Sequence, residues 1–126
     1  MTQDPKNILL VEDDKFLSEM YATKLTENGF EVEVAVDGEK ALAMVKEQKP
    51  DLVLLDIVLP KMDGFEFLQF LKKDEATKDV LVIILTNLGQ KEEVEKGLKL
   101  GANDYIIKAH FTPTEVVAKV KKLLKT

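Results

Sequence analysis

The sequence predicts an α/β fold built on a parallel sheet, and three observations support this prediction. Continuous apolar runs such as Leu52–Leu55 and Val80–Leu85 are typical of strands buried on both faces. Segments with the apolar period of an amphipathic helix lie between these runs. Strand and helix alternate five times along the chain, which favours a parallel sheet with helices on both faces. Right-handed crossovers limit the topology to doubly wound forms.

The predicted strands are short and end in turn residues or polar residues. The second of them alternates valines with Glu31 and Glu33, so it should have one face in water. The strand before Asp56 is apolar throughout and is followed by an irregular turn that contains Pro60 and Asp63-Gly64. The five predicted strands are Asn7–Val11, Phe30–Val36, Leu52–Leu55, Val80–Leu85 and Tyr105–Ile107.

Five helices are predicted from periodicity and from capping residues. The first begins at Lys15 after an Asp14 N-cap and ends at Asn28-Gly29. Its apolar side is expected to consist of Phe16, Leu17, Met20, Tyr21 and Leu25. The others are a helix around Ala41–Val45 that ends at Lys49-Pro50, a helix from Gly64 to Lys73, a helix with Val94, Leu98 and Leu100 that stops at Gly101, and a helix from Pro113 to Leu124.

Length and composition fit one domain over residues 1–126, with residues 1–5 expected to be flexible. The chain is 45% hydrophobic and 33% charged, so it can bury a core and stay in solution. It has no apolar run long enough for a membrane span and no apolar leader, which predicts a cytoplasmic protein. It has no cysteine, which excludes disulfides and thiolate metal sites.

The charge is unevenly distributed. Residues 1–64 contain 7 lysines and 14 acids, whereas residues 65–126 contain 11 lysines and 9 acids. All 18 basic residues are lysine, so the chain has no guanidinium group for bidentate recognition of phosphates or bases. We therefore expect no direct nucleic-acid binding and interpret the lysines of the last helix as a solvated face.

Polar side chains follow four of the predicted strands. Because the carboxyl ends of parallel strands meet at one edge of the sheet, we expect these side chains to lie together. Each has a simpler interpretation by itself: an acid can cap a strand or begin a helix, and a lysine can be a surface charge. The side chains are those of Glu12, Asp13, Asp56, Thr86 and Lys108.

This set of side chains is suited to phosphoryl transfer. Three carboxylates repel one another, and Lys108 together with a divalent cation would relieve the repulsion. Carboxylate ligands favour Mg²⁺, and the absence of His or Cys at a ligand spacing argues against Zn²⁺. Asp56 could attack phosphorus, while Lys108 and the Thr86 hydroxyl bind the phosphoryl oxygens. The chain has no nucleotide-binding loop, so we expect a small phosphoryl compound or a phosphorylated protein as donor.

Over nearly its whole length the sequence resembles the receiver domain of two-component response regulators. The matching segments are Ile8–Asp14, Asp56 to Gly64, Thr86, and Gly101-Ala102-x-Asp104-Tyr105-Ile106-Ile107-Lys108. The resemblance implies a flavodoxin-like, doubly wound, five-stranded parallel sheet of strand order 2-1-3-4-5 with five helices.

The resemblance also implies a role for each matching residue. Asp56 would be the phosphoacceptor, supplied by a sensor histidine kinase, and Lys108 would pair with the phosphoryl group. Mg²⁺ would be bound by Asp13, Asp56 and the Val58 carbonyl, and by Glu12 largely through water. Thr86 would move toward the phosphoryl group, and Tyr105 would turn inward with it.

Two positions beside the site depart from the family pattern. Position 87 is Asn where a small residue is usual, so its bulk could narrow access or its amide could bind the phosphoryl group. Position 109 is Ala where Pro is usual, and we expect a trans peptide bond before it because a cis bond would cost about 2.5–4 kcal/mol. His110 and Phe111 follow, so this loop is expected to have its own shape, with His110 solvated.

The predicted function is therefore a phosphorylation-dependent signalling switch, a stand-alone receiver that also autodephosphorylates. It would be an enzyme only in catalysing its own phosphorylation and dephosphorylation. Its expected partners are a sensor histidine kinase or a histidine phosphotransfer protein and a downstream protein, bound near the fourth helix, fifth strand and fifth helix, with the chain a monomer or a phosphorylation-dependent dimer. The alternative is a binding module that uses the same fold without phosphorylation.

The lifetime of the phosphoryl group gives a first testable prediction. Val58 and Leu88 come two residues after Asp56 and Thr86, at positions that flank the site in this family. Both are apolar, so neither can position a water for hydrolysis, and we expect slow autodephosphorylation. Decay of the acyl phosphate should be faster in Val58→Asn than in the wild type. An unchanged decay rate on this substitution would contradict the explanation.

Overall fold

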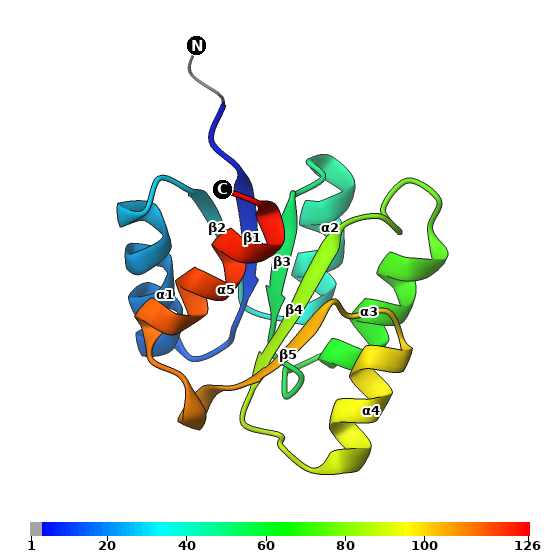
Figure 1. Ribbon diagram of the computed structural model, residues 1–126. Coiled ribbons are helices and arrows are strands. Elements are labelled where there is room, and N and C mark those ends of the chain that lie inside the picture. Colours follow the sequence, from blue (N-terminus) through cyan, green and yellow to red (C-terminus); the bar gives the residue numbers. More distant parts are fainter. Residues whose placement is uncertain (1–3) are drawn as a thin grey trace.

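The computed structural model describes residues 4–126 and contains one five-stranded sheet in which every paired strand is parallel (Figure 1). The strand order is β2-β1-β3-β4-β5, so the predicted α/β doubly wound fold with order 2-1-3-4-5 and five helices is confirmed. The strands are β1 (Asn7–Val11), β2 (Glu31–Ala35), β3 (Leu52–Leu55), β4 (Leu81–Thr86) and β5 (Asp104–Ile107).

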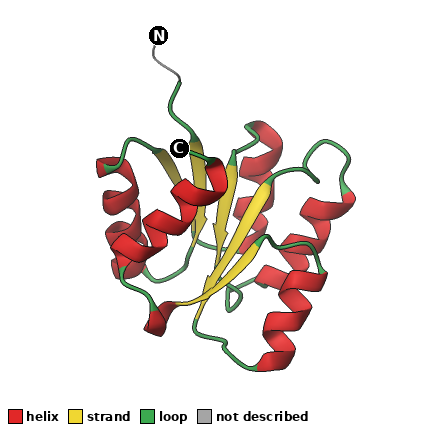
Figure 2. Ribbon diagram, in the orientation of Figure 1, coloured by secondary structure: helices red, strands yellow, loops and turns green. Residues whose placement is uncertain are grey.

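Helices cover both faces of the sheet (Figure 2). One core layer packs α1 and α5 on the face that carries Ile8 and Leu10, and the opposite layer packs α2 and α3 on the face that carries Leu9 and Val11. This alternation explains why residues 8–11 of β1, all of β3 and residues 81–85 of β4 are apolar without interruption, since both faces are buried. The helices are α1 (Lys15–Glu27), α2 (Gly38–Glu47), α3 (Gly64–Lys73), α4 (Lys91–Lys99) and α5 (Pro113–Leu124).

Capping residues begin three helices, and the cap predicted at Asp14 is confirmed. The Asp14 carboxylate accepts a hydrogen bond from the N–H of Leu17 at 2.9 Å and begins α1. Asp63 caps α3 in the same way, through the N–H of Glu66 at 3.0 Å. Thr112 begins α5 with Pro113 in the first turn.

The register of the sheet places the strand ends side by side. Val11 pairs with Leu55, Leu55 with Ile84, and Thr86 with Ile107. The residues that follow β1, β3 and β5 therefore emerge at the same edge as the end of β4, which is the lower edge in Figure 1.

The prediction for Phe16 is wrong. Its side chain is 75% exposed, whereas Tyr21 and Leu25 of the same helix are buried. Phe16 instead lines a surface groove together with Met20 and Pro113, near the start of α5. In a helix of 3.6 residues per turn the buried stripe is narrow, and Phe16 falls just outside the part that contacts the sheet.

Smaller differences concern the edges of the predicted elements. Leu98, one of the apolar residues from which α4 was predicted, is 45% exposed. β2 has one buried residue, Ala35, because it is an edge strand. A short 3-10 turn, Lys108–His110, follows β5 and was not predicted. The expectation of a flexible start falls mainly on residues 1–3, which lie outside the described residues.

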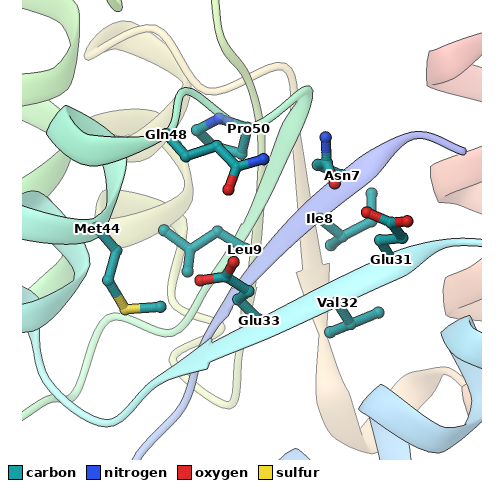
Figure 3. Close-up of a pocket in the computed structure, with 9 residues that line it drawn as sticks. All are labelled: Asn7, Ile8, Leu9, Glu31, Val32, Glu33, Met44, Gln48 and Pro50. Atoms are coloured by element: carbon teal, nitrogen blue, oxygen red, sulfur yellow. The ribbon is translucent and has the colours of Figure 1, made fainter. Parts of the chain in front are cut away.

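A cavity of about 220 Å³ opens at the amino ends of β1 and β2, against the end of α2 (Figure 3). Met44, Gln48 and Pro50 line one side of it, and Leu9 and Glu33 line the other. It is more enclosed than the crevice at the carboxyl edge of the sheet. It contains none of the five polar side chains that the sequence singles out.

Among residues 4–126, no helix combines the length and the apolar character that a membrane crossing requires.

The start of α5 supports a second prediction. The Thr112 hydroxyl accepts from the N–H of Glu115 at 3.1 Å, and the Glu115 carboxylate accepts from the N–H of Thr112 at 2.8 Å. Thr112→Ala should lower the free energy of unfolding by about 1 kcal/mol, measured by urea denaturation at pH 7. Thr114→Ala, in the same exposed turn without a capping bond, is the control. An equal loss in both variants would contradict the role of the cap.

The same cap gives the sign of a pH dependence. The hydrogen bonds from the backbone and the hydroxyl of Thr112 lower the pKa of Glu115 below its usual value of 4.5. The stability that this carboxylate contributes is therefore present above pH 4.5 and is lost as pH falls through the lowered pKa. Thr112→Ala should weaken this part of the acid sensitivity.

Candidate functional site

Asp56 directly follows β3, and backbone groups of neighbouring residues hold it in place through hydrogen bonds. Its N–H continues the sheet pairing to the carbonyl of Val11 at 3.0 Å. Its Oδ1 accepts hydrogen bonds from the N–H groups of Ile57 at 2.7 Å and Val58 at 3.4 Å. The residue is only 7% exposed. A buried carboxylate needs such donors, because an unpaired charge in a protein interior is costly.

The turn after Asp56 brings α3 back close to it. The N–H of Gly64 donates to the carbonyl of Ile57 at 2.9 Å. A Cβ atom on residue 64 would lie 2.3 Å from the carbonyl oxygen of Asp56, so only glycine allows α3 to begin here. The Asp63-Gly64 pair therefore has two local tasks: Asp63 caps the helix and Gly64 gives room to the strand end.

Lys108 joins two of the buried acids. Its Nζ donates to Oε1 of Glu12 at 2.6 Å and to Oδ2 of Asp56 at 2.8 Å. The side chains of all three are at most 9% exposed. Burial acts to lower the pKa of Lys108, but the hydrogen bonds to Asp56 and Glu12 outweigh it and raise that pKa. The ammonium group is therefore charged at neutral pH.

Glu12 and Asp13 complete an acidic cluster. Burial raises the pKa of the Glu12 carboxyl, although Lys108 and the N–H of Asp14 donate to it. Asp13 is exposed beside it. One carboxylate oxygen from each of Glu12, Asp13 and Asp56 lies within 4.8 Å of the others. Three clustered carboxylate oxygens are a donor set that suits a hard cation such as Mg²⁺.

A crevice of about 320 Å³ contains these groups together with the end of β4. Thr86 is 1% exposed, and its hydroxyl accepts from the N–H of Leu88 at 3.4 Å. The structure thus brings together all five side chains that the sequence placed at this edge. The crevice is lined by Glu12, Asp13, Asp14, Leu17, Asp56, Val58, Thr86, Asn87, Leu88 and Lys108.

Tyr105 belongs to β5, and its side chain contacts the loop between β4 and α4. Its hydroxyl donates to the carbonyl of Leu88 at 2.6 Å. Burial, followed by the charges of Glu93 and Asp56, raises the pKa of Tyr105 to about 12. The Tyr105 ring is thus turned toward the loop that follows Thr86.

The two departures from the family pattern contact each other. Oδ1 of Asn87 accepts a hydrogen bond from the N–H of Ala109 at 3.1 Å. No cis peptide bond occurs within residues 4–126, so the bond before Ala109 is trans, as predicted. His110 is exposed, as expected. The sequence alone suggested neither the pairing of Asn87 with Ala109 nor the Leu88 carbonyl as acceptor for Tyr105, because backbone partners leave no signal in residue types.

Comparison with known proteins gives a consistent result. Residues 8–121 match the sequence model of the response regulator receiver domain. The chain is 42% identical to the DNA-binding dual master transcriptional regulator RpaA of Synechocystis sp. over 94% of its own length and 48% of that protein. It is 40% identical to the phosphate regulon transcriptional regulatory protein PhoB of Escherichia coli, over 95% of the chain and 52% of PhoB. The chain thus spans about half the length of these curated relatives.

Solved structures show the same fold. A CheY-like response regulator receiver domain protein from Methanospirillum hungatei superposes with a TM-score of 0.89 at 31% sequence identity. The match covers 96% of this chain and 94% of that protein.

The buried ion pairs of Lys108 give a third prediction. Lys108→Met would leave Glu12 and Asp56 buried without their cation, so the free energy of unfolding in Mg²⁺-free buffer should fall by about 3 kcal/mol. Lys49→Met is the matched control, because Lys49 pairs with Asp79 at 2.8 Å on the surface and such pairs contribute less than about 1 kcal/mol. Chemical denaturation measures both. A loss in Lys108→Met no larger than in the control would contradict the stabilising role of Lys108.

Proposed function

Because the chain belongs to the response regulator receiver domain family, we propose that Asp56 accepts the phosphoryl group of this phosphorylation-dependent signalling switch. One observation carries the assignment: the Asp56 carboxylate is buried at the carboxyl edge of the sheet and is bonded to the Lys108 ammonium at 2.8 Å, beside two further acids. Glu12 and Asp56 both contact Lys108, but Asp56 is the acid that follows β3, the middle strand of the five.

The reaction at Asp56 is a transfer to a carboxylate oxygen. That oxygen forms a bond to phosphorus while the bond from phosphorus to the donor breaks, and the donor's leaving group takes the electron pair. The product is an acyl phosphate, which carries more negative charge than the carboxylate did. Lys108 remains protonated and pairs with the new phosphoryl oxygens, and the Thr86 hydroxyl donates to one of them.

The acidic cluster fits a magnesium ion. We propose that Asp13 and Asp56 bind it through carboxylate oxygens, Val58 through its backbone carbonyl, and Glu12 largely through water. Support comes from the carboxylate oxygens of Glu12, Asp13 and Asp56, which lie within 4.8 Å of one another. When bound, Mg²⁺ supplies positive charge that offsets the repulsion between these acids and an incoming phosphoryl group.

The switch consists of Thr86 and Tyr105. A hydrogen bond from the Thr86 hydroxyl to the phosphoryl group would draw the end of β4 toward Asp56 and shift the loop that begins at Asn87. Tyr105 is bonded to that loop through the Leu88 carbonyl, so the shift reaches β5 and α4. The resulting change in surface near α4, β5 and α5 alters contacts with other proteins.

The partners follow from this chemistry. The phosphoryl donor is a sensor histidine kinase or a histidine phosphotransfer protein, and the target is a further protein. RpaA is a DNA-binding regulator, but this chain matches about half of it and its basic residues are all lysine. We therefore assign no DNA contact to the receiver itself. The domain acts in the cytoplasm, as a monomer or a phosphorylation-dependent dimer, and catalyses only its own phosphorylation and dephosphorylation.

An assay with acetyl phosphate provides the fourth prediction and tests the alternative. With Mg²⁺, the wild type should form an acid-labile acyl phosphate, detected as a mass increase, and Asp56→Asn should form none. Beryllofluoride should shift the amide signals around Thr86 and Tyr105 in the wild type, because it mimics a phosphoryl group on a carboxylate. Thr86→Ala should still be phosphorylated but should show a smaller shift at Tyr105.

These results separate a phosphorylated switch from a receiver-like module that binds partners without phosphorylation. A wild type that stays silent with both reagents would favour the binding module. A phosphorylated Asp56→Asn variant would remove Asp56 from its assigned role and direct the search to another carboxylate.

A further inference from the structure

Asn87 makes one side-chain hydrogen bond within the part of the chain that the structure describes. Its Oδ1 accepts from the backbone N–H of Ala109 at 3.1 Å, and Asn87 also lines the crevice that contains Asp56. Ala109 is the second residue of the 3-10 turn Lys108–His110. The first N–H groups of a helical turn have no partner inside it, so Asn87 supplies a protein acceptor for the exposed N–H of Ala109, which would otherwise bond to water.

The next two residues of the same loop also contact the β5 segment. The Leu88 carbonyl accepts from the Tyr105 hydroxyl at 2.6 Å. A Cβ atom at Gly89 would lie 3.2 Å from Cδ1 of Ile107, which shows how closely the loop passes β5. The loop 87–89 is thus attached to the chain on both sides of Lys108: at Tyr105 and Ile107 before it, and at Ala109 after it.

These attachments begin where the sheet stops controlling the geometry. Thr86 pairs with Ile107, and strand pairing ends there. Beyond this pair, the position of the loop that follows Thr86 relative to Lys108 depends on individual bonds between that loop and the segment around Lys108. Phosphoryl transfer depends strongly on such positioning, because the groups that bind the phosphoryl oxygens must be in place before the transition state forms.

We propose that Asn87 is a positioning residue for phosphoryl transfer: by binding the N–H of Ala109 it holds the loop after Thr86 against Lys108 and keeps Tyr105 on the Leu88 carbonyl. The proposal rests on the function assigned to Asp56 above. It gives the two unusual residues of this chain one shared role, since a proline at position 109 would have no N–H for Asn87 to bind.

The two halves of this hydrogen bond can be removed separately. Asn87→Ala removes the acceptor and Ala109→Pro removes the donor. Each variant should be phosphorylated by acetyl phosphate with Mg²⁺ about 3- to 10-fold more slowly than the wild type, the range expected for one lost hydrogen bond. The double variant should be no slower than the slower single variant, because both substitutions remove the same interaction. His110→Ala, which keeps both partners, should match the wild type.

A second measurement reports on the loop itself. In a Tyr21→Phe background Tyr105 is the only tyrosine, and acrylamide should quench its fluorescence more strongly once Asn87→Ala loosens the loop. The Ala109 amide should also exchange with solvent faster in Asn87→Ala, whereas Asn87→Asp, which keeps an acceptor oxygen, should retain the protection. If Ala109→Pro does not fold, these two measurements and the rate of Asn87→Ala decide the question.

The outcomes distinguish this inference from the proposed function. If the wild type is phosphorylated on Asp56 but Asn87→Ala reacts at the same rate, the role of Asn87 is wrong and that of Asp56 stands. Slowing in the double variant equal to the product of the two single effects would show that Asn87 and Ala109 act independently, which also overturns the inference. If the wild type is not phosphorylated, both proposals fail together.

Discussion

The ammonium group of Lys108 is the interaction on which the rest of the site depends. It is bonded to Glu12 at 2.6 Å and to Asp56 at 2.8 Å, and all three side chains are nearly buried. Without it, two carboxylates from different strands would face each other in a poorly solvated crevice. One positive charge does not balance the three clustered acids, and their carboxylate oxygens are a donor set that suits a further hard cation such as Mg²⁺.

The two sides of the crevice are held in place by different numbers of interactions. Asp56 and Glu12 follow the neighbouring strands β3 and β1, whose apolar residues are buried, so the sheet fixes their backbone. Gly64 then fixes how closely α3 approaches Asp56, because any side chain there would collide with the Asp56 carbonyl. On the other side of the crevice, the loop after Thr86 is held by individual hydrogen bonds from Tyr105 and Ala109. Asp56, on a rigid strand end, thus faces a loop that few bonds restrain. A new charge on Asp56 could therefore shift the loop after Thr86 without disturbing the sheet.

The sequence predicted the strands, the cap at Asp14, and the meeting of Glu12, Asp56, Thr86 and Lys108, because these depend on local propensity and on the geometry of any parallel sheet. It failed for Phe16, which periodicity placed on the buried side of α1 although 75% of it is exposed. Which apolar residues of a helix become buried depends on where the helix crosses the sheet and the neighbouring helix. Neither position can be predicted from the residues of the helix alone.

The sequence by itself therefore determined the fold class, the resemblance to receiver domains and the set of side chains at the carboxyl edge of the sheet. Only the tertiary structure decided that Lys108 joins Glu12 to Asp56, that Tyr105 already contacts Leu88, and that Asn87 binds the N–H of Ala109. The physical reason is the same for each of these pairs. Their partners lie 17 to 96 residues apart along the chain or are backbone groups that every residue type carries, so only packing can bring them together.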